Sequence, residues 1–148
     1  MMAADEGAAI LETNNDGPKI PDAKKTKFDV IIIGAGPAGY TAGIYCSRAG
    51  YDTLILSGIL PGGQLVNTTE VENYPGFENG IMGPDLMIDM RKQSQKMGTT
   101  IIDDVAVDVD FRRAPYKVLT GSEEYEGRAV IIATGANPRK MGITGEEE

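Results

Sequence analysis

The segment FDVIIIGAGPAG, residues 28–39, constrains the fold of this 148-residue chain more than any other stretch. Its bulky apolar start predicts a short strand that is buried on both faces. The G-x-G-x-x-G pattern that follows assigns Gly34 to a tight turn, Gly36 to close approach by a ligand, and Gly39 to close helix packing. Because the pattern lies between a strand and a helix, it predicts a dinucleotide-binding turn rather than a chance glycine turn.

The residues after this pattern predict a βαβ unit. Pro37 suits the first turn of a helix, and Gly50 suits the position just beyond a helix that ends near Arg48. Residues 52–56, DTLIL, predict the second strand. An acidic residue usually ends this strand and holds a ribose 2′-hydroxyl, but Ser57 stands there in this chain. Either Ser57 and nearby backbone groups hold the ribose, or the ligand is not NAD.

Further elements are predicted beyond the second strand. A helix is expected from Gly83 to about Met97, followed by a third strand in residues 99–103. From Ala106 the segments VDVDF, YKVLT and EYEGR predict a small antiparallel meander, and residues 129–132, AVII, predict a return to a buried apolar strand. The predicted fold class is therefore α/β, with a parallel sheet, helices and an antiparallel β-meander.

The composition excludes several classes of function. A net charge of −8 argues against nucleic acid or an anionic membrane as a partner, and no apolar run is long enough for a membrane span. The first residues lack a basic region followed by an apolar stretch, so we expect no secretion signal, and polar residues 1–27 are expected to form a mobile tail. With no histidine and only Cys46, we expect no metal site, no Cys/His catalysis and a reducing compartment.

The segment GGQLVNTTEVENYPGF, residues 62–77, shows neither helical nor strand periodicity. Its apolar and aromatic side chains are too numerous for a solvated linker, and long loops in compact domains are usually functional or disordered. Gln64 and Asn73 carry amide groups that can bind the edge of a heteroaromatic ring, whereas Glu70 and Glu72 are interpreted as solvated or structural. We therefore interpret this loop as a wall of the ligand site.

These segments together resemble the low-molecular-weight, FAD-dependent thioredoxin reductases. GAGPAG, GGQL with TTEVENYPGF, and ATGANPRKM with Gly145-Glu146 occur in that family's order, from Phe28 to about Gly145. The flavoprotein component of alkyl hydroperoxide reductase has a similar loop, but Pro75-Gly76-Phe77 favours thioredoxin reductase. The resemblance implies a Rossmann-like FAD-binding domain over residues 28–148, and the Ser57 position agrees with it.

The resemblance also implies where FAD would be held. The glycine turn would meet the pyrophosphate, the stretch after the second strand would line the adenosine side, Asn73 would lie near the flavin, and a second glycine turn would close the site. The implied cofactor-binding residues are Gly34, Ala35, Gly36, Pro37, Ala38, Gly39, Ser57, Gly58, Ile59, Leu60, Pro61, Gly62, Gly63, Gln64, Asn73, Ala106, Ala133, Thr134 and Gly135.

Members of that family are commonly homodimers in which electrons pass from NADPH through FAD to a Cys-x-x-Cys pair and then to thioredoxin, and we expect a cytoplasmic location for this protein. The NADPH site and the cysteine pair lie in a domain for which this sequence has no counterpart. We therefore expect an incomplete FAD domain from a fragment, a truncated gene product or a split protein, inactive alone and without catalytic residues of its own. The alternative is a non-catalytic dinucleotide-binding or assembly module that needs a partner.

Overall fold

The computed structural model describes residues 25–137, 139 and 141–144, so the expected tail of residues 1–27 lies almost wholly outside the described residues. The elements are, in chain order, β1 (Lys27–Ile33), α1 (Pro37–Arg48), β2 (Thr53–Leu56), the 3₁₀ helix η1 (Gly63–Asn67), β3 (Glu70–Val71), β4 (Ile81–Met82), α2 (Gly83–Lys96), β5 (Thr100–Ile102), β6 (Ala106–Asp110), β7 (Tyr116–Thr120) and β8 (Glu124–Ile132). No helix in the described part of the chain is long and apolar enough to cross a membrane.

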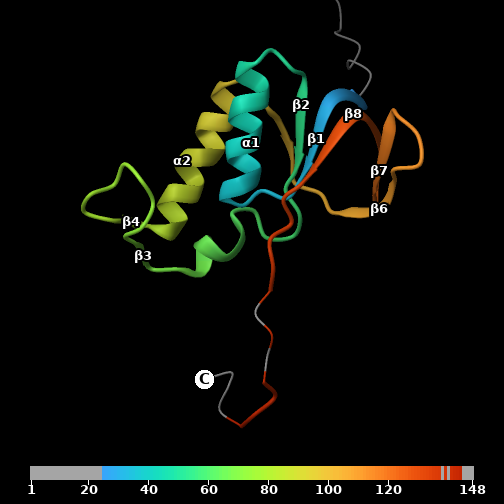
Figure 1. The fold of residues 1–148 in the computed structure, drawn as a ribbon. Helices are drawn as coiled ribbons and strands as arrows, with labels where there is room; N and C mark the ends of the chain where they lie inside the picture. Colours follow the sequence, from blue (N-terminus) through green and yellow to red (C-terminus); the bar gives the residue numbers. More distant parts are fainter. Residues whose placement is uncertain (1–24, 138, 140, 145–148) are drawn as a thin grey trace, which may run out of the picture.

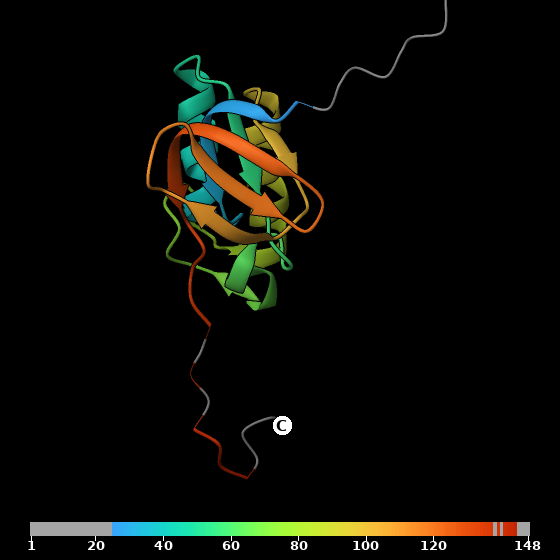
Figure 2. The ribbon, with the colours of Figure 1, turned by 90° about the vertical axis from the view of Figure 1, so that its right-hand side faces the viewer.

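The principal sheet of the described residues runs in the order β5-β2-β1-β8-β7-β6. Strands β5, β2, β1 and β8 are parallel neighbours, whereas β8, β7 and β6 form the antiparallel meander that the sequence predicts. Helices α1 and α2 cover one face of the parallel strands in Figure 1, and Figure 2 shows the meander lying across the other face. The fold is the predicted α/β architecture in three layers.

Side chains on alternate positions of β1 and β2 build two separate cores. Ile32 and Ile55 face the helices, where their cluster includes buried residues of both, whereas Ile31 and Leu54 face the meander. All four are fully buried. Because successive strand residues point to opposite faces, a strand covered on both sides has a continuous apolar sequence. For this reason every residue of FDVIII after Asp29, and of DTLIL after Thr53, is apolar.

Helix α2 begins and ends where its sequence predicts. Asp85 lies in its first turn and Lys96 in its last, an order of charges that suits the helix dipole. Gly98, with φ of +101°, adopts the left-handed conformation just after the helix. At the other end, a Cβ on Gly83 would lie 2.1 Å from the Leu65 carbonyl oxygen, so this glycine allows η1 to pack directly against the start of α2.

Two expectations were wrong. EYEGR and AVII are one continuous strand, β8, of which only residues 124–127 pair with β7. Residues 126–132 of β8 pair with β1, and the end of β8 is not buried, since Ile132 is 66 % exposed. The segment 62–77 also contains regular structure, namely η1 and the short strand β3. Elements this short complete too few repeats for a period to be visible in the sequence.

Candidate functional site

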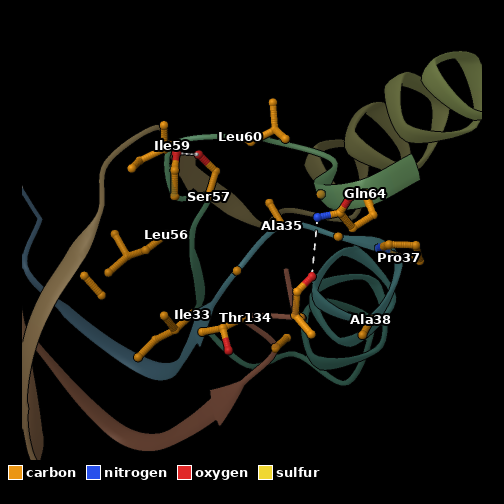
Figure 3. Close-up of a pocket in the computed structure, with 18 of the residues that line it drawn as sticks. Ile33, Ala35, Pro37, Ala38, Leu56, Ser57, Ile59, Leu60, Gln64 and Thr134 are labelled. Carbon is orange, nitrogen blue, oxygen red and sulfur yellow. Dashed lines mark hydrogen bonds between the residues drawn. The ribbon is translucent and has the colours of Figure 1, made fainter. Parts of the chain in front are cut away.

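A cavity of about 530 Å³ lies at the carboxyl-terminal edge of the parallel strands (Figure 3). Ligand sites in open α/β sheets occur at this edge, and the volume is in the range typical of small-molecule pockets. None of the described residues that line it is charged. They are Ile33, Gly34, Ala35, Gly36, Pro37, Ala38, Leu56, Ser57, Gly58, Ile59, Leu60, Gly63, Gln64, Leu65, Val105, Ala106, Ala133, Thr134, Gly135, Ala136 and Asn137.

The first glycine turn joins three strands at the floor of the cavity. Gly34 has φ of +110°, a backbone conformation that residues other than glycine rarely adopt. Its N–H donates to the Leu56 carbonyl at 2.8 Å. A Cβ on Gly34 would lie 2.2 Å from the Ala133 carbonyl oxygen. The Ala133 N–H in turn donates to the Ile33 carbonyl at 2.8 Å. The turn therefore holds the ends of β1, β2 and β8 together at the cavity.

The amino terminus of α1 opens onto the same cavity. Gly36 is the N-cap residue of α1, and no side chain caps the helix. The first N–H groups of a helix lack partners within the helix and carry a partial positive charge, which favours phosphate. A Cβ on Gly36 would meet no atom within 4 Å, so the space beside this backbone is open. With no charged side chain in the lining, these backbone groups are its main feature for attracting an anion.

The long loop contributes one wall, as the sequence predicts for its first residues. The Gly62 N–H donates to the Ala35 carbonyl at 2.8 Å, which fixes the start of η1 beside the first glycine turn. From η1 the Gln64 amide nitrogen reaches across to the Ala136 carbonyl and to the Asn137 side-chain oxygen, each at 3.4 Å (Figure 3). Gln64 thus links the loop to the segment after β8 over the cavity.

Most of the implied cofactor-binding residues are brought together here, but four are not in the lining. Gly39 is buried behind the cavity, where a Cβ would lie 2.0 Å from the Gly34 carbonyl oxygen. Pro61 and Gly62 stand between the lining residues Leu60 and Gly63 but are not part of the lining themselves. Asn73 is exposed and lies in a second hollow, formed by residues 72–78, whose lining shares no residue with that of the first. Its expected position near a flavin stays a prediction.

Six lining residues were missed by the sequence reasoning. Ile33 and Leu56 are the last residues of β1 and β2, and Val105 precedes β6, so the position of each at a strand end was a usable signal. Ala136 and Asn137 follow the second glycine turn directly. Leu65 lies in η1, whose orientation the sequence did not predict. The structure therefore extends the implied site mainly by apolar side chains, and Asn137 is the polar side chain that it adds.

Comparison with known proteins identifies the family of this chain. The sequence profile of the pyridine nucleotide-disulphide oxidoreductases matches residues 28–148. The chain belongs to this family. Among curated relatives, thioredoxin reductase from Rickettsia bellii is 51 % identical over 125 residues, covering 84 % of this chain, and thioredoxin reductase from Listeria monocytogenes is 53 % identical over 123 residues, covering 82 %.

Solved structures of this oxidoreductase family have the same fold. Thioredoxin reductase from Giardia duodenalis matches with a TM-score of 0.76 at 38 % identity, covering 83 % of this chain and 40 % of its own. The Lactococcus lactis enzyme matches with a TM-score of 0.75 at 43 % identity, covering 81 % and 39 %. The two curated relatives are covered to 40 % and 38 %. This chain therefore spans about 40 % of the length of the relatives it matches.

Proposed function

We propose that this chain forms the first part of the FAD site of a thioredoxin reductase, and that its cavity binds the adenosine diphosphate half of the cofactor. The observation that carries the proposal is the meeting of the glycine turn after β1, the open N-terminus of α1 and the loop after β2 around one uncharged cavity. A pyrophosphate needs N–H donors and close backbone approach, and the space open beside Gly36 supplies both.

Different lining residues would hold different parts of the proposed ligand. The backbone from Gly34 to Ala38 would hold the pyrophosphate, and Ser57 and Gly58 would hold the ribose next to it. Ala106 and Val105, which precede or begin β6, would lie along the adenine. FAD, when bound, supplies two-electron transfer between a nicotinamide and a disulfide. The apolar side chains of Ile59 and Leu60, exposed in the free protein, would exclude water from the bound nucleotide.

The thiol chemistry of thioredoxin reductases is not assigned to these residues. Cys46 is the single cysteine of the sequence and lies on α1, outside the cavity lining. We therefore extend the family's use of NADPH and of a thioredoxin-like partner to the protein only as part of this proposal. The residues of this chain are assigned the binding and orientation of FAD.

The proposal predicts that the purified protein binds FAD and that the ADP half dominates the affinity. Adding protein to FAD should change its fluorescence in a saturable way, and ADP should compete with it. FMN contains the same ring system and one phosphate but lacks the AMP moiety, so it should bind at least about tenfold more weakly. Equal affinity for FMN and FAD, or no saturable response up to millimolar protein, would contradict the proposal.

A further inference from the structure

The end of β2 has a polar network in place of the acidic residue that usually holds a ribose. Ser57 is 4 % exposed and belongs to the cavity lining. Its hydroxyl oxygen lies 2.8 Å from a carboxylate oxygen of Asp103, the residue that directly follows β5. The Ser57 N–H donates to the Ile102 carbonyl and the Gly58 N–H to the Asp104 carbonyl, each at 3.0 Å. The neighbouring strand end therefore holds Ser57 through both its backbone and its side chain.

Asp103 is itself held in one orientation from the helical layer. Two nitrogens of the Arg91 guanidinium on α2 donate to its two carboxylate oxygens, both at 2.8 Å. Burial raises the pKa of Tyr40, an α1 residue that is only 1 % exposed, and the neighbouring charge of Arg91 partly offsets this effect. A bidentate arginine–carboxylate contact is directional as well as charge-assisted. Arg91 on α2 and Asp103 after β5 thus form a continuous chain of hydrogen bonds that ends at Ser57.

The charge of Asp103 determines the direction of the Ser57 hydrogen bond. The Arg91 hydrogen bond lowers the pKa of Asp103 most, and the Ser57 hydrogen bond lowers it further against the opposing effect of burial. An ionised carboxylate has only acceptors, so Ser57 donates its single hydroxyl hydrogen to Asp103. A second acceptor, the Gly58 carbonyl, is farther away at 3.4 Å. The Ser57 oxygen can then only accept from a ligand in the cavity.

We infer that Arg91, Asp103 and Ser57 together replace the missing ribose-binding acid, with Asp103 as a positioning residue that acts through Ser57. This inference rests on the proposed function and specifies which nucleotides the site accepts. The ligand class is an adenine nucleotide whose ribose carries a free 2′-hydroxyl, because that hydroxyl donates to the acceptor-only Ser57 oxygen. A 2′-phosphate would bring a second anion toward Asp103 and would find no donor on Ser57.

The test compares two ligands in the same protein. Titration calorimetry with ADP and with 2′-deoxy-ADP should give the wild-type protein an affinity ratio of about ten in favour of ADP. In Asp103→Ala the ratio should fall below about threefold, because the Ser57 hydroxyl is then free to rotate and to donate elsewhere. A general loosening of the fold would weaken both ligands alike and leave the ratio unchanged, so the ratio separates positioning from a structural role.

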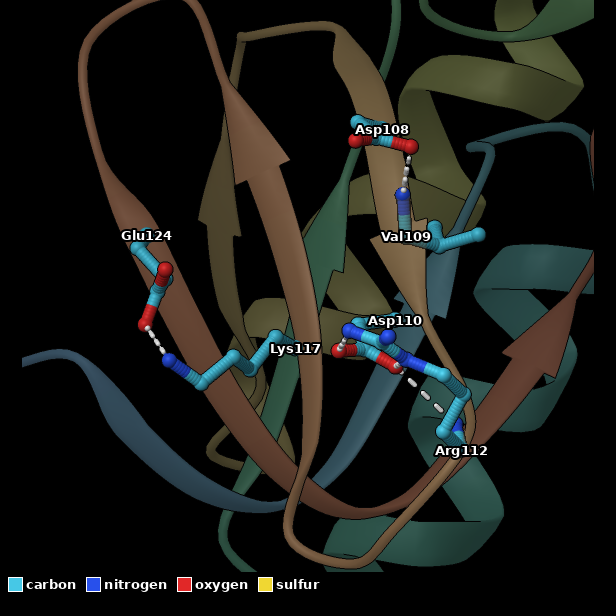
Figure 4. A network of polar contacts seen from close by, with 6 residues as sticks. All are labelled: Asp108, Val109, Asp110, Arg112, Lys117 and Glu124. Carbon is cyan, nitrogen blue, oxygen red and sulfur yellow. Dashed lines mark hydrogen bonds and ion pairs between the residues drawn. The ribbon is translucent and has the colours of Figure 1, made fainter.

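Matched variants show whether the effect belongs to this carboxylate. Asp110 makes an equivalent bidentate contact with Arg112, at 2.9 and 2.7 Å, on the meander and outside the cavity lining (Figure 4). Asp110→Ala should therefore keep the wild-type ratio. Ser57→Ala should lower the ratio as Asp103→Ala does, and the double variant should lower it no further, since the two residues act as one unit. Asp103→Asn, which keeps the shape of the side chain, should give an intermediate ratio.

The outcomes distinguish this inference from the proposed function. If the wild-type protein binds neither ADP nor 2′-deoxy-ADP up to millimolar concentration, both are overturned. If it binds ADP but Asp103→Ala and Asp103→Asn keep the wild-type ratio, or the wild type shows no preference, the positioning role is overturned and the nucleotide site stands. A ratio that falls in both Asp103 variants and in Ser57→Ala, but not in Asp110→Ala, supports the inference.

Discussion

Gly39→Ala is expected to lower the free energy of unfolding by about 3 kcal/mol. Gly39 is the third residue of α1, and an added Cβ would lie 2.0 Å from the Gly34 carbonyl oxygen and 2.9 Å from its carbonyl carbon. Both are backbone atoms of the first glycine turn, so relief requires α1 to move away from β1. Intrinsic helix propensity acts in the opposite direction, since alanine is favoured over glycine by about 1 kcal/mol. The expected loss of stability therefore comes from the steric contact with Gly34, because helix propensity alone would make Gly39→Ala stabilising.

The measurement is urea unfolding followed by circular dichroism, with Gly43→Ala as the control in the same helix. The three atoms nearest to a Cβ on Gly43 would all belong to side chains, namely the Ser94 hydroxyl oxygen at 2.7 Å, the Ile55 Cδ1 at 2.8 Å and the Thr99 Cγ2 at 3.3 Å. These atoms can shift without moving the backbone, so Gly43→Ala should destabilise the protein by much less than Gly39→Ala. Equal stability of the wild type and Gly39→Ala would show that α1 does not need glycine to pack on the turn.

The sequence predicts the βαβ unit and α2 well because their signals are local. The glycine pattern, Pro37 and Gly50 mark both ends of α1, and the helix ends at Arg48 as expected. Fifteen of the nineteen cofactor-binding residues that the resemblance implies also line the cavity. The carboxyl ends of parallel strands gather at one edge, so residues that follow strands in the sequence meet in space.

The features that were missed depend on contacts between distant residues. Ser57 and Asp103 are 46 positions apart, and no local pattern links them or indicates that Arg91 on α2 points at the same carboxylate. The continuity of β8 is similar, since the partner of its first residues is β7 and the partner of most of its length is β1. Asn73 and Gln64 carry the same amide group in one loop, yet only Gln64 lines the cavity.

Gly36→Ala should weaken the binding of ADP and of FAD by at least tenfold while changing the free energy of unfolding by about 1 kcal/mol or less. Gly36 has φ of −79° and ψ of −172°, which alanine adopts without strain, and an added Cβ meets no protein atom within 4 Å. The methyl group would instead fill space beside the first N–H groups of α1, where the proposed pyrophosphate must approach the backbone. The loss of an N-cap glycine is the remaining source of destabilisation.

Gly36→Ala and Gly39→Ala together separate two functions of one six-residue motif. Calorimetric titration with ADP and urea unfolding, applied to both variants, should show a binding defect in the first and a stability defect in the second. The contrast follows from geometry. A Cβ added to Gly36 has open space around it, whereas a Cβ added to Gly39 would lie 2.0 Å from the Gly34 carbonyl oxygen. If Gly36→Ala bound ADP as tightly as the wild type, the nucleotide would not approach this turn, and the assignment of the pyrophosphate to it would be wrong.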